Sequence, residues 1–271
     1  MNIVYAGNKK VFDGLLISVL SIIENTSAQI DFFVLTLDLL DLDGDYIGIS
    51  EEEIDVIRQE IVKVNPKNTI QRLDVTNEFN QYLRNSKNLI NRYTPYALLR
   101  LLIDCRKEIP GKALYLDVDT VINRNIEQLY HLDITKCEFA ACRDRYGRFF
   151  FNPNYCNTGV LLLNVEKIRE TNLFKKVIAL LEKKEVFLSD QTGINKMAKR
   201  KKVLPRRFNE QKKVRKDTVI RHFSMQFRIF PKFHFVNIKP WNIEQVHNVY
   251  HCHEFDHILA KYSKIMQTRS K

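Results

Sequence analysis

The stretch that most constrains how this chain can fold is residues 112–122, KALYLDVDTVI. Its apolar run predicts a buried strand, and Asp117 and Asp119 stand at the carboxyl end of that strand. Ligands of open α/β sheets bind beyond the carboxyl ends of strands, so both aspartates occupy a place where chemistry is usually done. A D-x-D by itself favours a simpler interpretation, a solvated turn with two acidic residues.

The two carboxylates can also hold a cation. Residues two apart on an extended strand point the same way, which lets Asp117 and Asp119 face one ion. Acidic oxygens, waters and substrate phosphates are the usual ligands of Mg²⁺ and Mn²⁺. Both side chains are therefore candidate metal ligands.

Predicted strands and helices alternate along the chain. Strands are expected at 2–6, 31–37, 70–73, 112–116, 139–144, 157–164 and 218–223. Helices are expected at 12–23, at 95–103 and at 165–184, the last as one long helix. Further helices are expected after a Ser50–Glu53 capping box, from residue 190 behind a Ser189 cap, and in the tail. This alternation predicts an α/β fold with a mostly parallel sheet flanked by helices.

Two local features have more than one interpretation. The first strand and its polar turn suggest a nucleotide-binding βα unit, although the sequence contains no G-x-G-x-x-G. Arg100 is the lone charge in an intensely apolar predicted helix. It is either a surface arginine whose stem covers apolar residues or a site residue.

The net charge of +11 is large for 271 residues, and much of it lies in 199–202 and 206–216. Such charge attracts nucleic acid, an anionic membrane surface or a phosphorylated small molecule without choosing between them. A solvated basic face is the simplest explanation of most of these lysines.

The remaining composition predicts a cytoplasmic protein of one large domain, or of one domain with an appendage. No apolar run is long enough to span a bilayer, and the N-terminus begins directly as a strand, without the pattern of a secretion signal. The five cysteines are odd in number and contain no C-x-x-C, which is typical of reduced thiols.

A series of motifs follows in order between residues 3 and 241. They are Ile3-Val4-Tyr5-Ala6, Arg100, the D-x-D of 114–119, the stretch 156–164 (CNTGVLLLN), Asp190-Gln191, Arg207-Phe208-Asn209, His222 and Lys239-Pro240-Trp241. Taken together, the chain resembles the bacterial lipopolysaccharide-type galactosyl- and glucosyltransferases of glycosyltransferase family 8, which are relatives of glycogenin.

This resemblance implies a GT-A fold, with a Rossmann-like nucleotide-binding sheet. It implies a glycosyltransferase domain at 1–245 and a C-terminal helical tail at 246–271. The implied activity is Mn²⁺-dependent transfer of a hexose, galactose or glucose, from a UDP-sugar to a glycan or glycoprotein, with retention. If the basic charge has a function, the resemblance favours an anionic donor, an anionic acceptor or a peripheral contact with the inner membrane face.

The resemblance also assigns residues. The metal ligands are Asp117, Asp119 and a histidine, either His222, which stands in a strand pattern and is preferred, or His234. Mixed oxygen and imidazole ligation suits Mn²⁺ better than Mg²⁺, which stays the second candidate. The implied catalytic residues are Asp190 and Gln191. The implied substrate-binding residues are Ala6, Asn8, Arg100, Asp117, Val118, Asp144, Asn157, Thr158 and Lys239.

Three other classes of protein compete with a transferase. A nucleic-acid-binding protein would use the basic stretch 199–216, where only Phe208 is aromatic and no known module is visible. A relative without transfer activity would only bind a sugar nucleotide. A zinc metalloprotease would use residues 253–257, which spell H-E-x-x-H, a pattern that can bind zinc on a helix. Residues 258–271 supply no third ligand, so a histidine-rich surface helix is expected there.

Overall fold

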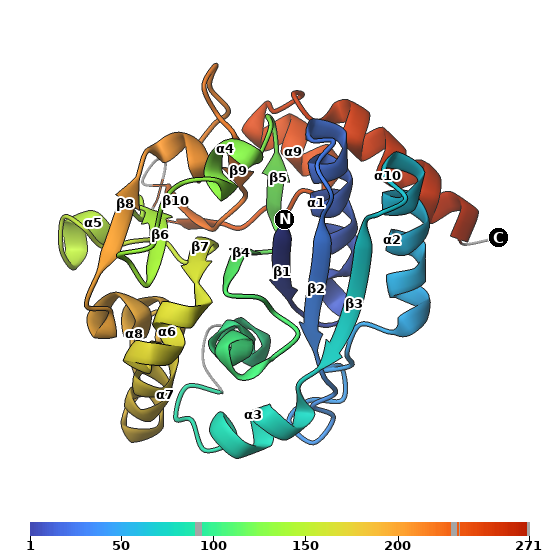
Figure 1. Ribbon diagram of the computed structural model, residues 1–271. Coiled ribbons are helices and arrows are strands. Elements are labelled where there is room, and N and C mark those ends of the chain that lie inside the picture. The colour runs from blue at the N-terminus through green and yellow to red at the C-terminus, as the bar shows by residue number, and fades with distance from the viewer. Residues whose placement is uncertain (90–93, 229–231, 233, 270–271) are drawn as a thin grey trace.

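The computed structural model describes residues 1–89, 94–228, 232 and 234–269, and a seven-stranded sheet divides it (Figure 1). The strand order is β3-β2-β1-β4-β7-β6-β8. The strands are β1 (Asn2–Ala6), β2 (Asp31–Thr36), β3 (Thr69–Asp74), β4 (Lys112–Leu116), β6 (Phe139–Cys142), β7 (Val160–Asn164) and β8 (Lys201–Leu204). β7 pairs antiparallel with both neighbours, and the other four pairings are parallel. The predicted α/β fold with a mostly parallel sheet is confirmed.

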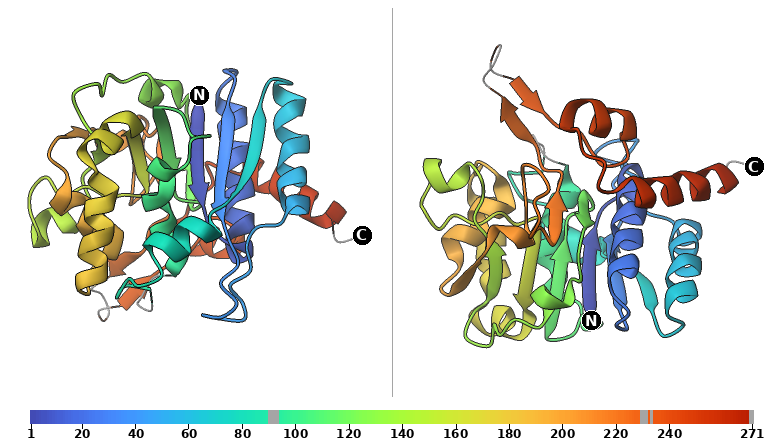
Figure 2. Two further views of the ribbon diagram at one scale, coloured as in Figure 1. Left: turned by 60° about the horizontal axis from the view of Figure 1, so that its bottom comes forward. Right: turned by 90° about the horizontal axis from the view of Figure 1, so that it is seen from above.

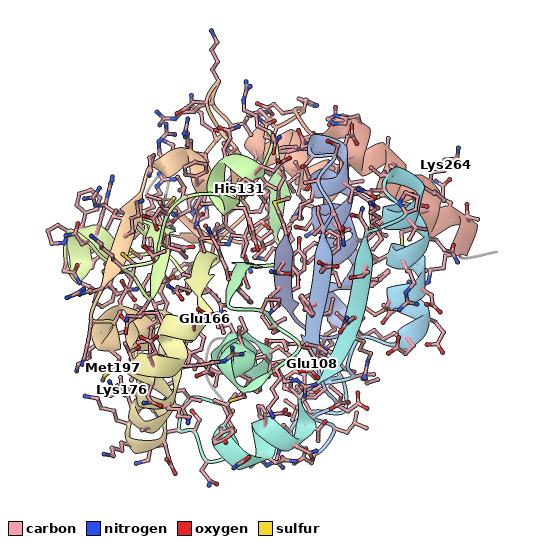
Figure 3. All side chains as sticks on the ribbon, viewed as in Figure 1. Glu108, His131, Glu166, Lys176, Met197 and Lys264 are labelled. Carbon is pink, nitrogen blue, oxygen red and sulfur yellow. The ribbon has the colours of Figure 1, made fainter. Side chains whose placement is uncertain are left out.

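Each face of the sheet carries its own hydrophobic core, because successive side chains of a strand point to opposite faces. In β1, Ile3 and Tyr5 belong to one core, whereas Val4 and Ala6 belong to the other. Side chains fill the space between the ribbons, and the labelled Lys176 lies toward the rim of the molecule (Figure 3).

The first core lies under α1 (Phe12–Asn25), α2 (Glu51–Val64) and α10 (Asp256–Arg269). Ser50 and Glu53 form the predicted capping box of α2, with hydrogen bonds in both directions. In the view from above, α10 crosses α1 (Figure 2). Its Ile258 and Leu259 are buried in this core. The expected boundary between 245 and 246 falls within α9 (Ile243–Tyr250).

The second core lies under η2 (Pro95–Cys105), α3 (Thr76–Tyr82), α6 (Val165–Thr171), α7 (Leu173–Lys183) and α8 (Ser189–Met197). Two predictions here were wrong. The single helix expected at 165–184 is broken at Asn172, whose left-handed φ of 52° turns the chain between α6 and α7. Ser189 does not cap α8 but is its first residue, and Leu188 occupies the N-cap position.

Shorter elements complete the fold. They are η1 (Lys9–Val11), β5 (Thr120–Ile122), α4 (Glu127–Tyr130), α5 (Gly147–Phe150), η3 (Arg206–Phe208), β9 (Ile220–His222), β10 (Gln226–Arg228) and β11 (His234–Val236). The strand expected at 218–223 is β9, which lies outside the large sheet and pairs with β5. Part of the basic run forms the edge strand β8, and lysines are a common protection of such edges.

Candidate functional site

A tight turn after β4 places the two aspartates of the D-x-D. The Asp117 N–H donates to the Gly159 carbonyl at 2.7 Å, and the Thr120 N–H and hydroxyl donate to the Asp117 carbonyl at 3.1 and 2.8 Å. The chain then enters β5, where Thr120 pairs with His222 of β9. This pairing carries His222 to the two carboxylates across a long interval of sequence.

Three side chains converge there. His222 Nε2 lies 3.1 Å from Asp119 Oδ1 and 3.7 Å from Asp117 Oδ2. On its other oxygen, Asp119 contacts the ammonium of Lys239, with Nζ 2.5 Å from Oδ2. Burial raises the pKa of the Asp119 carboxyl, but the neighbouring Lys239 and His222 together lower it by more, so its pKa lies well below the usual range. Asp119 is therefore a buried carboxylate ion.

Neighbouring amides fix which nitrogen of His222 carries a proton. The Gly159 N–H donates to Asn157 Oδ1 at 3.0 Å, and Asn209 Nδ2 donates to the same oxygen at 2.9 Å. Asn209 therefore presents its own oxygen to His222 Nδ1, 3.1 Å away. A carbonyl oxygen can only accept, so Nδ1 carries a proton, and in the neutral imidazole Nε2 then presents a lone pair.

The lone pairs of His222 and the aspartates thus face one another. Asp119 Oδ1 is buried, and no residue in the described part of the chain donates a hydrogen bond to it. A cation between Asp117, Asp119 and His222 would satisfy that oxygen, so the donor set fits a divalent metal ion. His234, the alternative ligand, is exposed on β11 and its Nδ1 contacts the Lys232 carbonyl at 2.7 Å. The structure brings His222, and not His234, to the aspartates.

Arg100 is buried, which excludes a snorkelling surface arginine. Its Nη2 donates to Asp117 Oδ1 at 2.9 Å and its Nη1 to the Thr158 carbonyl at 2.6 Å. Its Nε lies 3.2 Å from Asp190 Oδ2. Burial lowers the pKa of the guanidinium, but Asp117 and the groups around it raise it by more. Arg100 therefore links Asp117 to the start of α8.

The predicted catalytic residues Asp190 and Gln191 open α8 after a strained turn. Leu188 and Ser189 have φ of 58° and 33°, values that non-glycine residues rarely adopt and that cluster at functional sites. Gln191 Oε1 accepts the Thr158 N–H at 3.1 Å. Burial raises the pKa of the Asp190 carboxyl, although Arg100 opposes this.

Asp144 joins the same hydrogen-bond network from the end of β6. Its Oδ2 accepts from Asn157 Nδ2 at 3.0 Å and Gln191 Nε2 at 3.4 Å, and its Oδ1 accepts from the N–H groups of Tyr146 and Gly147. A continuous chain of hydrogen bonds therefore runs from His222 through Asn209 and Asn157 to Asp144 and Gln191.

The remaining predicted residues lie around the turn between β1 and η1. Ala6 ends β1, Asn8 is buried and bridges to Gly48, and Val118 is half-buried between the two aspartates. A methyl group on Gly14 of α1 would lie 2.7 Å from the Val118 carbonyl and 2.4 Å from the ring of Trp241. Helix α1 and the Lys-Pro-Trp segment thus enclose the D-x-D turn.

The sequence assigned no site role to two residues that the geometry makes central. Asn209 orients His222, and its only signal was the Arg207-Phe208-Asn209 motif. Gly159 approaches the aspartates so closely that a methyl group on it would lie 2.2 Å from His222 Cε1 and 2.6 Å from Asp117 Oδ2. Only its place in the stretch 156–164 pointed to it.

Replacing Asn209 by alanine is expected to weaken Mn²⁺ binding about 10–100-fold, because partners that orient a metal-bound histidine typically contribute that much. Calorimetric titration of Mn²⁺ into both proteins measures the change. Asn209→Asp, which still accepts from Nδ1, is the control and should retain most of the affinity. Equal affinity of the alanine variant and the wild type would contradict the proposed orientation of His222.

Replacing Arg100 by methionine is expected to lower the free energy of unfolding by about 3–5 kcal/mol, since it leaves the buried Asp190 and the partly buried Asp117 without their counter-ion. Urea unfolding followed by circular dichroism measures this. The ion pairs that Arg58 makes with described residues are exposed, so Arg58→Met should cost less than about 1 kcal/mol. Similar losses in the two variants would contradict the structural role of Arg100.

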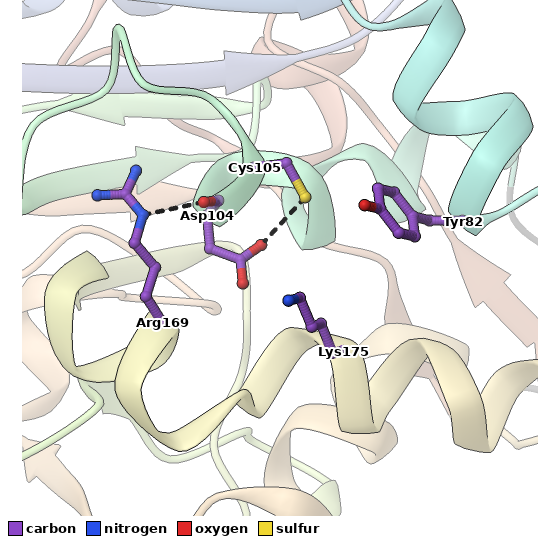
Figure 4. A pocket seen from close by; sticks show the side chains of 5 residues that line it. All are labelled: Tyr82, Asp104, Cys105, Arg169 and Lys175. Carbon is purple, nitrogen blue, oxygen red and sulfur yellow. Dashed lines mark hydrogen bonds between the residues drawn. The ribbon is translucent and has the colours of Figure 1, made fainter.

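A separate pocket of about 200 Å³ is lined by Tyr82, Asp104, Cys105, Arg169 and Lys175 (Figure 4). Burial raises the pKa of the Cys105 thiol to about 12, so it stays protonated and unreactive near neutral pH. Arg169 Nε donates to the Asp104 carbonyl at 2.9 Å, a structural contact. Cys105 therefore gives this pocket no reactive thiol.

The H-E-x-x-H pattern does not lie on one helix. His253 stands in the linker before α10, and His257, in its first turn, pairs with Glu24 of α1. The two histidines therefore do not share the helix face that a metalloprotease requires.

The fold and site together define an α/β protein with a candidate cation centre at the carboxyl end of its middle strand. The family model for glycosyl transferase family 8 matches residues 2–245. This chain belongs to glycosyltransferase family 8, as its sequence motifs predicted.

Two relatives illustrate the membership. A Haemophilus influenzae protein that bears a provisional glycosyltransferase name is 30% identical over 77% of this chain and 63% of its own length. The lipopolysaccharide 1,2-glucosyltransferase of Escherichia coli is 26% identical over 77% of this chain and 62% of its own. The chain thus matches less than two thirds of the length of either relative.

Solved structures confirm the predicted GT-A fold. The galactosyltransferase LgtC, solved with donor and acceptor sugar analogues, superposes with a TM-score of 0.69 at 19% identity, over 97% of this chain and 96% of LgtC. GlyE of Streptococcus pneumoniae superposes with a TM-score of 0.69 at 20% identity, over 98% of this chain and 63% of GlyE. In the described part of the chain, no helix has both the length and the apolarity to cross a membrane.

Proposed function

We propose that this protein is a retaining hexosyltransferase that moves galactose or glucose from a UDP-sugar to a glycan or glycoprotein. The observation that carries the proposal is the buried Asp119 oxygen without a donor among the described residues, facing Asp117 and His222 in a family 8 chain. The proposed site lies within residues 1–245, and the proposed location is the cytoplasm.

Asp117, Asp119 and His222 would hold Mn²⁺, which the imidazole ligand favours over Mg²⁺. When bound, the ion supplies positive charge that stabilises the departing UDP. Lys239, already beside Asp119, adds a fixed charge for the same phosphates. Ala6, Asn8 and Val118 would contact the nucleoside from the turn after β1 and the turn between the aspartates.

Arg100, Asn157, Thr158, Asp190 and Gln191 would position the sugar, and Asp144 would reach the acceptor. Asp190 forms an ion pair with Arg100, and Gln191 forms hydrogen bonds with Thr158 and Asp144. These contacts make both residues poor nucleophiles. We therefore favour front-face attack. An acceptor oxygen bonds to the anomeric carbon, the bond from that carbon to UDP breaks with its electron pair on the phosphate, and the phosphate takes the acceptor's proton.

The experiment that tests the proposal is UDP release from a panel of UDP-sugars, with Mn²⁺ and with chelator. Slow hydrolysis of one UDP-hexose that requires Mn²⁺ is the expected result, and it would identify the donor. No release from any donor, together with no Mn²⁺-dependent binding of UDP, would overturn the proposal.

A peripheral membrane contact has support in α5, which begins three residues after Asp144. Phe149 and Phe150 are 74% and 77% exposed, and Arg148 packs over the ring of Phe149. Phe187 adds a third exposed ring near Phe151, with centroids 6.1 Å apart. Exposed aromatic rings beside basic side chains are typical of surfaces that enter the interface of anionic membranes.

Replacing Phe149 and Phe150 together by serine is expected to reduce co-sedimentation with phosphatidylglycerol vesicles about tenfold, because two rings that would enter the lipid are removed. Leu40→Ser removes another exposed apolar side chain, 56% exposed and away from α5, and should leave sedimentation unchanged. This contact would be contradicted if the wild-type protein did not bind the vesicles, or if the double variant bound them as well as the wild type does.

A further inference from the structure

Four of the seven histidines of the chain stand within eleven residues, at 247, 251, 253 and 257. The segment forms the corner between α9 and α10, where His251 takes a left-handed φ of 49° and ends α9. This turn brings the last turn of α9 against the first residue of α10. The proposed transfer chemistry makes no use of the corner.

Three side chains meet at this corner. His247 Nε2 lies 2.7 Å from Asp256 Oδ1, and His253 Nδ1 lies 3.2 Å from Asp256 Oδ2. The two imidazole rings stack, with centroids 4.5 Å apart and planes inclined by 23°. One ligand atom from each residue lies within 4.8 Å of the others, so small side-chain rotations bring all three to one ion.

We propose that His247, His253 and Asp256 form a second metal site, selective for Zn²⁺ or a similar transition-metal ion. Two imidazoles and one carboxylate suit such ions, whereas Mg²⁺ and Ca²⁺ prefer oxygen ligands alone. Water completes the coordination, because the three side chains are at least partly exposed. His257 takes no part, since it pairs with Glu24. The ligand set therefore differs from the one that H-E-x-x-H suggests.

A metal at this corner would tie α9 to α10. The latter packs on α1 through the buried Ile258 and Leu259. The ion would therefore stabilise the docking of the C-terminal helix, and it would do so independently of sugar transfer.

Calorimetric titration of ZnCl₂ tests the site in a protein that carries Asp117→Asn and Asp119→Asn, which removes the other candidate centre. One Zn²⁺ should bind, and the ion should raise the melting temperature. Adding His253→Gln should weaken binding about tenfold or more, whereas His257→Gln, the matched control, should leave it unchanged. Circular dichroism checks that each variant is folded.

A second measurement uses the unaltered protein. Crystals grown with ZnCl₂ should show an anomalous peak at the zinc edge between His247, His253 and Asp256. Absence of the peak, absence of binding heat in the aspartate variant, or equal loss in the two histidine variants would overturn the proposal. The three side chains would then only join the two helices by hydrogen bonds.

Discussion

The Asp119→Asn variant is expected to release UDP from its donor about a thousandfold more slowly than the wild type in Mn²⁺. Asparagine keeps the shape of the side chain but removes the negative charge that faces His222 on one oxygen and Lys239 on the other. Losing the charge that holds a catalytic cation and orients a lysine costs about 4 kcal/mol of transition-state stabilisation, which corresponds to that factor.

Initial rates over a Mn²⁺ titration measure the loss. The control is Asp133→Asn, because Asp133 is exposed and its carboxylate accepts hydrogen bonds from no described residue but Thr135. It should behave as wild type. Full Mn²⁺-dependent activity of Asp119→Asn would mean that the metal binds elsewhere, and the proposed centre would be wrong.

Adding a single methyl group at Gly159 is expected to abolish Mn²⁺ binding and to reduce UDP release at least about a hundredfold. The Cβ of Gly159→Ala would lie 2.2 Å from His222 Cε1 and 2.6 Å from Asp117 Oδ2, so both ligands must move apart. Displacements of about 1 Å near reacting groups cost on the order of a hundredfold in rate. Overpacking should also lower the free energy of unfolding by about 1–3 kcal/mol.

Gly44→Ala is the matched control, because no atom of the described residues lies within 4 Å of a Cβ at that position. It should match the wild type in activity and in urea unfolding. Titrating Mn²⁺ into the folded Gly159→Ala variant distinguishes the loss of the metal site from the loss of the fold. Normal Mn²⁺ affinity in that variant would contradict the close approach of Gly159 to the ligands.

Much of the fold was predictable because local patterns specify local structure. Ser50 and Glu53 lie three residues apart, which is the spacing of a reciprocal cap, and α2 begins there. The long helix at 165–184 was wrong because periodicity alone does not reveal the left-handed residue Asn172. The edge strand β8 was missed because its lysines resemble a solvated surface, although they pair in the sheet.

The residues of the candidate site also fall into two groups, those that local sequence patterns predict and those that only the folded chain brings together. The sequence by itself determined the strand of 112–116 and the two aspartates behind it, because a period of two and a buried apolar run are local properties. Only the tertiary structure brings His222, rather than His234, to the aspartates, since the pairing of β5 with β9 is a contact between distant segments. It also decided that Arg100 is buried: its charge is stabilised by Asp117 and Asp190, which lie far away along the chain and meet it only in the folded protein.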